Sequence, residues 1–231
     1  MSYYLQNQLS YQHPCILNTL QQHLSIVVVI PCFNETHLIK SLESLNNCTL
    51  PIGLVEVITV FNCSIADDEK IKQANLTMLN EALVWLKSNA KKGIDFYFIE
   101  ANNLPVKDAG VGLARKIGMD EAVVRFEQLN KDGIIACFDA DSTCAANYLV
   151  ELEKHFEQHP KSPACSINFE HPLQGNEFSK ANYQAIEAYE LHLRVYYKTF
   201  QVDGWSLQKC TSILWFSLCL PYHRFEHGGK K

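Results

Sequence analysis

Short apolar segments, separated by stretches with helical spacing, constrain the fold of this chain more than any other feature. The apolar segments are Ser25–Pro31, Leu54–Phe61, Ile94–Ala101 and Ile134–Phe138. Unbroken hydrophobicity over so few residues is typical of a strand covered on both faces. Apolar residues recur on one helical face in the stretches Leu38–Leu45, Ala66–Lys91, Leu113–Val124, Leu149–Phe156 and Ile186–Phe200. This alternation predicts an α/β fold with a Rossmann-like, mostly parallel sheet and helices on both faces.

Composition narrows the class of protein. Hydrophobic residues make up 47% of the 231 positions and charged residues 19%, which excludes a disordered chain. The net charge of −5 argues against a basic, nucleic-acid-binding footprint across the sequence. The longest apolar runs, Ile26–Phe33 and Ile213–Leu220, are shorter than the roughly 18–20 residues of a transmembrane helix. We therefore expect a protein without a nucleic-acid partner or a transmembrane helix.

Basic residues and cysteines bear on the compartment. The first basic residue is Lys40, so the basic start of a signal or transit peptide is absent. The nine cysteines are scattered and form no CxxC pair. This pattern predicts a cytoplasmic protein with reduced thiols, without a disulfide framework or a zinc site.

Polar residues follow each expected strand, and the sharpest signal is Asp139-Ala140-Asp141 after the fourth. Ligands of open α/β sheets bind at the carboxyl ends of the strands. In an extended chain, residues i and i+2 point to the same side, so these carboxylates would converge there. Paired carboxylates suit a hard divalent cation, whose other ligands would be waters and the phosphates of a substrate. A chance Asp-x-Asp in a solvated turn is the alternative, and the position after a strand favours the metal site.

Other candidates at the strand ends have two interpretations each. Glu35 is either a ligand contact or an acid at the start of the next helix. Asp108 and Arg115 either bind substrate or lie on a helix surface, with Asp108 as the N-cap. Gly110-x-Gly112 lacks the third glycine of the dinucleotide fingerprint, which argues against a nicotinamide or flavin cofactor.

Several motifs stand in a definite order along the chain. They are SIVVVIPCFNE, a polar turn after the second strand, DAGVGLARKIGMDEA and GIIACFDADSTCAANYL. In this order they resemble the family 2 glycosyltransferases of the GT-A fold, over Ser25 to Phe200. The resemblance implies a metal-dependent, inverting, hexosyltransferase-like enzyme with Mn²⁺ or Mg²⁺. It would transfer a sugar from a nucleotide diphosphate sugar to a saccharide or a lipid-linked acceptor.

The resemblance also assigns a nucleoside site. Pro31, Phe33 and Glu35 match the nucleoside-contacting end of the family's first strand. Asn62 stands where the family usually has an acidic residue that reads the base. This departure leaves the choice between uridine and guanosine open.

The phosphate side of the donor site follows from the same resemblance. Asp108, Gly110 and Arg115 belong to the segment that flanks the diphosphate and the donor sugar. Asp139 matches the carboxylate near the ribose or the metal, and Asp141 matches the metal ligand that bridges to the diphosphate.

The family pattern stops after Phe200. An inverting enzyme needs a general base, which in the family is an acidic residue of a Glu-Asp pair at a helix start. Only Asp203 and Glu226 remain in the tail, and neither has these surroundings, so no catalytic base is found. We therefore divide the chain into an N-terminal extension (1–24), a GT-A domain (25–200) and an atypical tail (201–231).

A shifted reading frame explains the tail. Allowed codons for Trp215–Lys230, read out of frame, permit a string that looks like the acceptor-side segment of related glycosyltransferases. This hypothesis predicts a frameshift between the codons of Lys198 and Leu214, and a chain truncated on its acceptor side. The alternative is a natural tail helix or interfacial anchor, which would allow peripheral contact with a membrane through Ile213–Leu220.

Two other functions compete with an active transferase. One is a catalytically incomplete remnant that binds a nucleotide sugar without turnover, which the missing base favours. The other is a sugar-1-phosphate nucleotidyltransferase, which shares the sheet architecture. That enzyme needs a Gly-rich loop with a basic residue after the first strand, and Pro31–Glu35 contains neither.

Overall fold

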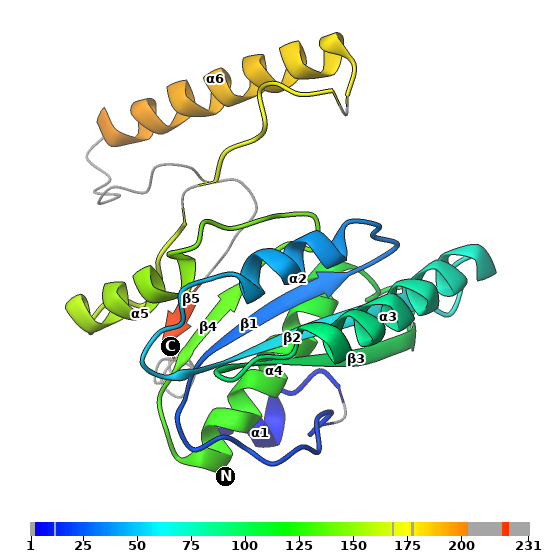
Figure 1. The fold of residues 1–231 in the computed structure, drawn as a ribbon, viewed down its shortest axis with the longest axis vertical. Helices are drawn as coiled ribbons and strands as arrows, with labels where there is room; N and C mark the ends of the chain where they lie inside the picture. The colour runs from blue at the N-terminus through cyan, green and yellow to red at the C-terminus, as the bar shows by residue number, and fades with distance from the viewer. Residues whose placement is uncertain (1–2, 12, 168, 177, 203–218, 222–231) are drawn as a thin grey trace. The chain divides into compact units, whose positions relative to one another are not determined.

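The computed structural model describes residues 3–11, 13–167, 169–176, 178–202 and 219–221. They belong to two compact units, one of residues 1–164 and 219–231 and one of residues 165–218. The first unit contains the sheet and the helices that surround it (Figure 1). The second contains the long helix α6, Lys180–Val202. In this unit, Nδ1 of His171, which precedes α6, lies 2.6 Å from Oε1 of Glu190 in the helix.

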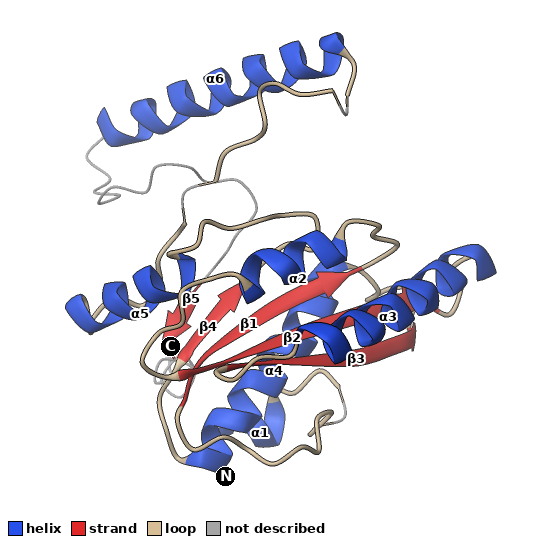
Figure 2. Ribbon diagram, viewed as in Figure 1, coloured by secondary structure: helices blue, strands red, loops and turns tan. Residues whose placement is uncertain are grey.

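The sheet has five strands in the order β3-β2-β1-β4-β5 (Figure 2). Four run parallel: β1 (Leu24–Cys32), β2 (Leu54–Ser64), β3 (Ile94–Leu104) and β4 (Ile134–Cys137). The edge strand β5, Cys219–Pro221, pairs with β4 in the antiparallel direction. The prediction of a mostly parallel α/β sheet is confirmed.

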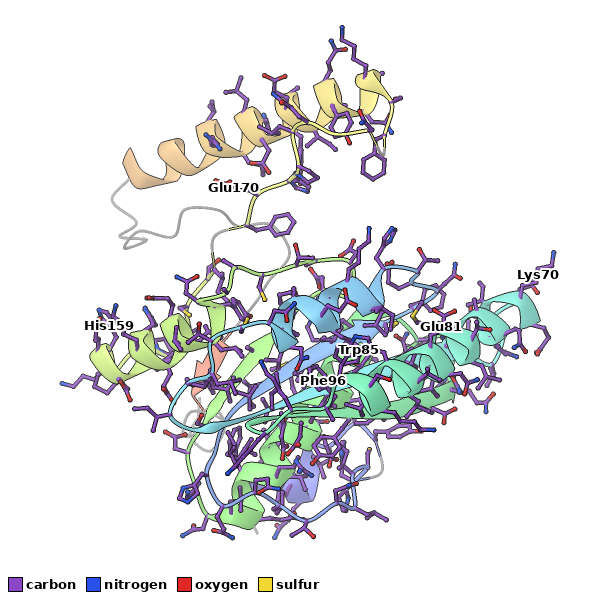
Figure 3. All side chains as sticks on the ribbon, viewed as in Figure 1. Lys70, Glu81, Trp85, Phe96, His159 and Glu170 are labelled. Atoms are coloured by element: carbon purple, nitrogen blue, oxygen red, sulfur yellow. The ribbon has the colours of Figure 1, made fainter. Side chains whose placement is uncertain are left out.

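Helices cover both faces of this sheet (Figures 1 and 2). On one face lie α2 (Leu38–Asn46) and α3 (Glu69–Asn89), and on the other lie α4 (Val111–Leu129) and the short α1 (Tyr3–Asn7). Helix α5 (Tyr148–Gln158) follows β4. Side chains fill the space between these layers (Figure 3), where the Trp85 ring of α3 meets the Phe96 ring of β3 edge-on at 5.1 Å. Among the described residues, no helix combines the length and hydrophobicity needed to cross a membrane.

Close packing of α4 on the sheet depends on a glycine. A Cβ at Gly118 would lie 2.4 Å from a Val29 methyl group and 3.2 Å from Val60. These valines belong to β1 and β2, so α4 packs on both strands too closely for a side chain at position 118. The expected helix in Leu113–Val124 is confirmed, and it continues to Leu129.

A buried ion pair joins the same helix to β2. Glu56 of β2 is 0% exposed and Arg125 of α4 is 1% exposed. The guanidinium binds both carboxylate oxygens, with Nε on Oε2 and Nη2 on Oε1 at 2.6 Å. It also lies 5.0 Å from the centre of the Tyr97 ring. Burial raises the pKa of the Glu56 carboxyl despite the neighbouring Arg125 cation. The pair therefore depends on both partners being present.

The N-terminal residues pack on α4 through two consecutive buried acids, of which Asp120 is the first. Asp120 accepts a hydrogen bond from the Tyr4 hydroxyl at 2.6 Å. Its other oxygen accepts from the Ser10 backbone N–H at 2.9 Å and from the Ser10 hydroxyl at 2.8 Å. The ammonium of Lys116, one turn earlier on α4, supplies the countercharge at 2.8 Å.

Glu121 is the second acid, and it holds the chain just before β1. Its Oε2 lies 2.8 Å from His13 Nδ1 and accepts from the Cys15 backbone N–H at 2.8 Å. Its Oε1 accepts from the Ile16 backbone N–H at 3.2 Å. Burial alone would raise the pKa of Glu121, but these hydrogen bonds outweigh it, and the pKa is lowered.

Glu121→Gln is therefore expected to destabilise the protein near neutral pH by about 1–3 kcal/mol, because buried donors lose their charged acceptor. Because the native pKa is lowered, the Glu121 carboxylate stabilises the fold at pH values above its ordinary pKa of 4.5. This stabilisation is lost as the pH falls through the native pKa. The difference between wild type and variant should shrink accordingly in urea titrations at decreasing pH. Glu151→Gln, at an exposed position of α5, is the control. Equal stability of the two variants at pH 7 would contradict this role for Glu121.

Candidate functional site

The predicted site residues gather at the carboxyl ends of β1 and β4. From β1 the chain continues through α2 to β2 on one side, whereas α4 brings it back to β4 on the other side of β1. The direction in which successive strands are added therefore reverses between β1 and β4. Ligands of open α/β sheets bind at such a point of reversal. Strand β4 ends beside Val29, before the end of β1 at Cys32, and the Phe138 N–H donates to the Val29 carbonyl oxygen at 2.9 Å.

An ion pair lies directly beyond the end of β4. Arg115, near the start of α4, donates from Nη2 to Asp139 Oδ1 at 2.6 Å. Both side chains are partly exposed, at 17% and 29%. Burial raises the pKa of the Asp139 carboxyl, Arg115 lowers it, Asp141 raises it, and the net shift is upward. Of the two interpretations of Arg115, the structure supports pairing, and its partner is itself a predicted site residue.

The segment after β4 is a turn rather than an extended continuation of the strand. Strand β4 ends at Cys137, and the Ser142 N–H donates back to the Asp139 carbonyl oxygen at 3.1 Å. The assumption of an extended Asp139–Asp141 segment is therefore wrong, because this turn forms directly beyond the sheet. Asp141 is exposed, and its charge still acts on Asp139.

The carboxylates of Asp139 and Asp141 fit a hard cation, although they do not form a closed protein cage. Among the described residues, no hydrogen bond or ion pair engages the Asp141 carboxylate, and the residue is exposed. Within the described part of the chain, the one group of three metal-donor side chains within 4.8 Å is His13, Cys15 and Glu121, where the segment before β1 meets the middle of α4. A cation at Asp141 would therefore take its other ligands from water and substrate, as Mg²⁺ commonly does.

The end of β1 is followed by one exposed aromatic ring, Phe33, and by one carboxylate, Glu35, that is hydrogen-bonded to nearby backbone. Pro31 is buried, whereas the Phe33 side chain is 45% exposed. Glu35 Oε1 accepts from the backbone N–H groups of Thr36 and His37, each at 2.8 Å. These N–H groups directly precede α2, so Glu35 Oε1 binds the start of this helix. The structure therefore favours the interpretation of Glu35 as an acid at the helix start over that of a ligand contact.

Asn75 of α3 connects the ends of β1 and β2, and sequence reasoning missed it. Its Oδ1 accepts from the Asn34 backbone N–H at 2.8 Å, and its Nδ2 donates to the Asn62 carbonyl oxygen at 2.9 Å. Asn75 is 3% exposed, and Asn34 has a φ of +48°. The available signal was a polar residue on the buried face of α3, in register with Met78, Leu79 and Ala82.

Asn75→Ala is expected to lower the free energy of unfolding by about 1–3 kcal/mol, because two buried backbone groups lose their partners. Asn80→Ala, at an exposed position of the same helix, should change it by less than about 0.5 kcal/mol. Urea unfolding of both variants measures the difference. If Asn75→Ala matched Asn80→Ala, the bridge between the strand ends would have no energetic role.

Asn62 carries an acceptor without a partner. The residue is 2% exposed, and among the described residues no donor reaches its Oδ1. Leaving a buried polar atom unpaired costs free energy, so such atoms often mark a functional site. Asn62 lies near the carboxyl end of β2, and Asn75 joins its backbone to that of Asn34, between Phe33 and Glu35.

The start of α4 differs from the sequence prediction. The N-cap is Gly110, with a φ of +155° that L-residues rarely adopt, and no side chain caps the helix. Asp108 as the N-cap is therefore wrong. Its backbone N–H donates to the Pro105 carbonyl oxygen at 3.0 Å in the preceding turn, and the residue is exposed.

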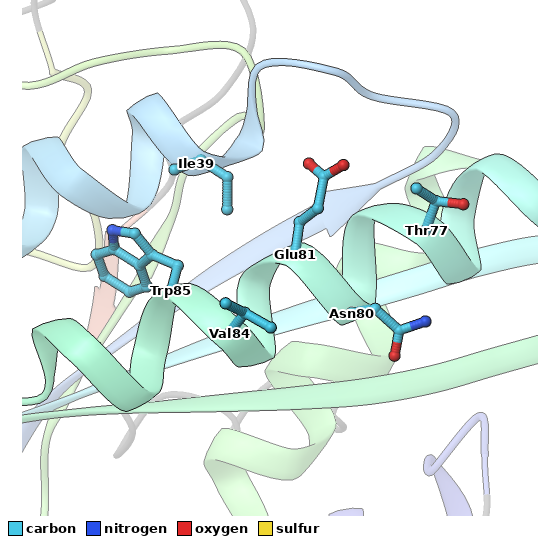
Figure 4. Close-up of a pocket in the computed structure, with 6 residues that line it drawn as sticks. All are labelled: Ile39, Thr77, Asn80, Glu81, Val84 and Trp85. Atoms are coloured by element: carbon cyan, nitrogen blue, oxygen red, sulfur yellow. The ribbon is translucent and has the colours of Figure 1, made fainter.

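A separate groove lies between α2 and α3 (Figure 4). Most of its surface is apolar, and Glu81 is its one charged side chain among the residues Ile39, Thr77, Asn80, Glu81, Val84 and Trp85. None of the predicted donor-site residues lines it. Asp203 and Glu226, the last carboxylates of the tail, lie outside the described residues, as does the tail apart from residues 201–202 and β5.

Comparison with known proteins gave matches among solved structures alone. No protein-family profile and no curated protein match the chain. The structure of S. aureus TarS residues 1–349 is 18% identical, with a TM-score of 0.41 over 68% of this chain and 38% of that one. The same TarS fragment in complex with UDP-GlcNAc is 20% identical, with a TM-score of 0.40 over 68% and 37%. The complex of this fragment with UDP is 18% identical, with a TM-score of 0.40 over 68% of this chain and 38% of that one. The chain thus spans well under half the length of these structures.

Proposed function

We propose that the chain binds the nucleoside diphosphate of a sugar donor at the carboxyl ends of β1, β2 and β4, as a family 2, GT-A-type glycosyltransferase or its donor-binding part. The observation that carries the proposal is the Arg115–Asp139 ion pair beside the exposed Asp141, at the point where the strand order reverses. This combination supplies a fixed cation, a fixed carboxylate and a second carboxylate open to a metal.

Each group has a chemical task in such a donor complex. Asp141 would hold Mn²⁺ or Mg²⁺, with Asp139 beside it and oriented by Arg115. A cation there supplies Lewis-acid neutralisation of the charge that grows on the leaving diphosphate. Arg115 lowers the pKa of the Asp139 carboxyl and so opposes the upward shift caused by burial. The open helix start at Gly110 and Asp108 would flank the diphosphate and the donor sugar.

The nucleoside would lie toward β2. The unpaired Asn62 Oδ1 can accept one N–H, and both uracil and guanine carry a ring N–H on their pairing edge. The exposed ring of Phe33 and the end of β1 at Pro31 provide an apolar neighbour for the base. We therefore propose a UDP-sugar or a GDP-sugar donor. The resemblance implies a saccharide or lipid-linked acceptor and an inverting reaction.

Nucleotide release separates the transferase from its rivals. Incubation with UDP-sugars and GDP-sugars and Mn²⁺ is expected to release one nucleoside diphosphate, and Asp141→Asn should abolish that release. Binding without release would identify the catalytically incomplete remnant. Release of pyrophosphate from a nucleoside triphosphate and a sugar 1-phosphate would instead identify a nucleotidyltransferase and refute the proposal.

A further inference from the structure

Two cysteines from distant parts of the chain meet beside the candidate site. Cys48 follows α2, and Cys144 lies between β4 and α5, yet their sulfur atoms are 3.5 Å apart. Cys48 is 4% exposed, whereas Cys144 is half-buried. Three other hydrogen bonds hold the same segments together. They join Ser41 Oγ to the Ala140 carbonyl at 2.7 Å, the Cys144 N–H to Ser44 Oγ at 3.2 Å, and the Thr49 N–H to the Ala146 carbonyl at 2.7 Å.

We propose that Cys48 and Cys144 are a redox-active dithiol, which small disulfides of the glutathione type convert reversibly to an intramolecular disulfide. The sulfur atoms approach closely, and the three hydrogen bonds between their segments keep them there in the reduced protein. The disulfide would join residues 96 positions apart. It would covalently attach the segment that carries Asp139 and Asp141 to the end of α2. The proposal does not depend on the nature of the substrate.

The environments of the two thiols set the order of events. The hydrogen bond from Cys48 lowers the pKa of Cys144 to about 7, against the effect of burial. The same contact, together with burial, raises the pKa of Cys48. Cys144 is therefore the thiol that ionises more readily, and it is the attacking group. It is also the more exposed of the two.

The exchange balances in two steps. The Cys144 thiolate attacks one sulfur of the small disulfide, whose S–S bond breaks and releases one thiolate. Cys48 then loses its proton to water and attacks Cys144 Sγ, which releases the second thiolate. Both leaving thiolates take up protons according to their own pKa. The protein loses two protons and two electrons, and the small disulfide is reduced to two thiols.

Peptide mapping of the full chain in glutathione buffers tests the pairing. Samples equilibrated at increasing ratios of oxidised to reduced glutathione are acid-quenched, alkylated and digested without reduction by Glu-C and Asp-N. This combination separates Cys48 from Cys63 and Cys144 from Cys137. We expect a Cys48–Cys144 linked peptide that disappears on treatment with dithiothreitol. Closing so long a loop should also raise the Tm of the oxidised protein by roughly 5–15 °C.

Substitutions test the order of attack. Cys48→Ser should accumulate a glutathione adduct on Cys144, whereas Cys144→Ser should leave Cys48 reduced. Cys63→Ala, which removes a buried thiol whose described partner is the Asn102 amide, should still form the linked peptide. The proposal is overturned if folded wild-type protein keeps both thiols alkylatable in oxidised glutathione. A persistent glutathione adduct in wild type, or linkage of either cysteine to a different one, would overturn it as well.

Discussion

Asp141→Asn is expected to remove the Mn²⁺-dependent part of the affinity for a nucleoside diphosphate. The Asp141 carboxylate is exposed beside the Arg115–Asp139 pair, so a cation there has this oxygen donor as its accessible protein ligand. Loss of even an outer-shell partner typically costs about 10–100-fold in metal affinity, so loss of a direct ligand should cost at least as much. The amide keeps the size of the side chain and removes its charge. Titrations of UDP and GDP with and without Mn²⁺ measure the loss.

Asp132→Asn is the matched control for that experiment. Asp132 is also exposed, but it precedes β4, at the opposite end of the strand from Asp141. Its substitution makes the same change in net charge and should leave Mn²⁺-dependent binding as in wild type. Equal loss in both variants would indicate a general charge effect. Retention of Mn²⁺-dependent binding in Asp141→Asn would contradict the proposed metal ligand.

Glu56→Gln is expected to produce the largest loss of stability, about 3–5 kcal/mol, because it leaves a buried guanidinium without its countercharge. Arg125 is 1% exposed and uses two nitrogen atoms on the Glu56 carboxylate, so a neutral amide cannot replace both charge-assisted bonds. At about 2–4 °C per kcal/mol in a domain of this size, the Tm should fall by roughly 10 °C. Urea and thermal unfolding measure both quantities.

An exposed ion pair of the same chain is the control for Glu56. Lys72 lies 2.7 Å from Glu69 on α3, and the Glu69 side chain is 85% exposed. Glu69→Gln should leave the Tm almost unchanged, because solvent screens such a pair. Replacing both buried partners with apolar residues, Glu56→Leu with Arg125→Met, should recover much of the stability lost in Glu56→Gln. A Tm equal to that of wild type in Glu56→Gln would show that the buried pair is dispensable.

The parallel sheet could be predicted because its strands depend on local composition. Each of β1, β2, β3 and β4 coincides with an apolar run, and the expected helices α2 to α6 lie between or after them. The helix expected in Ala66–Lys91 begins at Glu69, because the Asp68 side chain accepts the Lys70 N–H at 3.0 Å. That start is readable in principle, since Asp is a preferred N-cap residue.

Elements that depend on long-range contacts could not be predicted in the same way. Helix α1 is only five residues long, and its Tyr4 hydrogen-bonds to Asp120, 116 positions away. The three-residue strand β5 pairs with β4 from the tail, where no periodic pattern is present. Isolated helices and strands of this length are unstable, so their own residues carry little signal.

The site was predictable as a set of strand ends but not as a set of contacts. The positions of Asp139, Asp141 and Asn62 follow from the parallel sheet. The Arg115–Asp139 bond depends on where α4 crosses the sheet, and the turn after β4 depends on a local hydrogen bond to Asp139. Asn75 bridges two backbones across a packing interface, which no local pattern specifies.

Calorimetric titration of wild-type protein with UDP and with GDP tests for a metal-assisted nucleoside diphosphate site at the ends of β1, β2 and β4. Each titration is performed with and without Mn²⁺. The account predicts that one of the two nucleotides binds and that Mn²⁺ strengthens its binding. A rise in Tm with the same ligand should accompany it, since ligand binding stabilises the native state. Absence of binding by both nucleotides, in protein that unfolds cooperatively, would contradict the account.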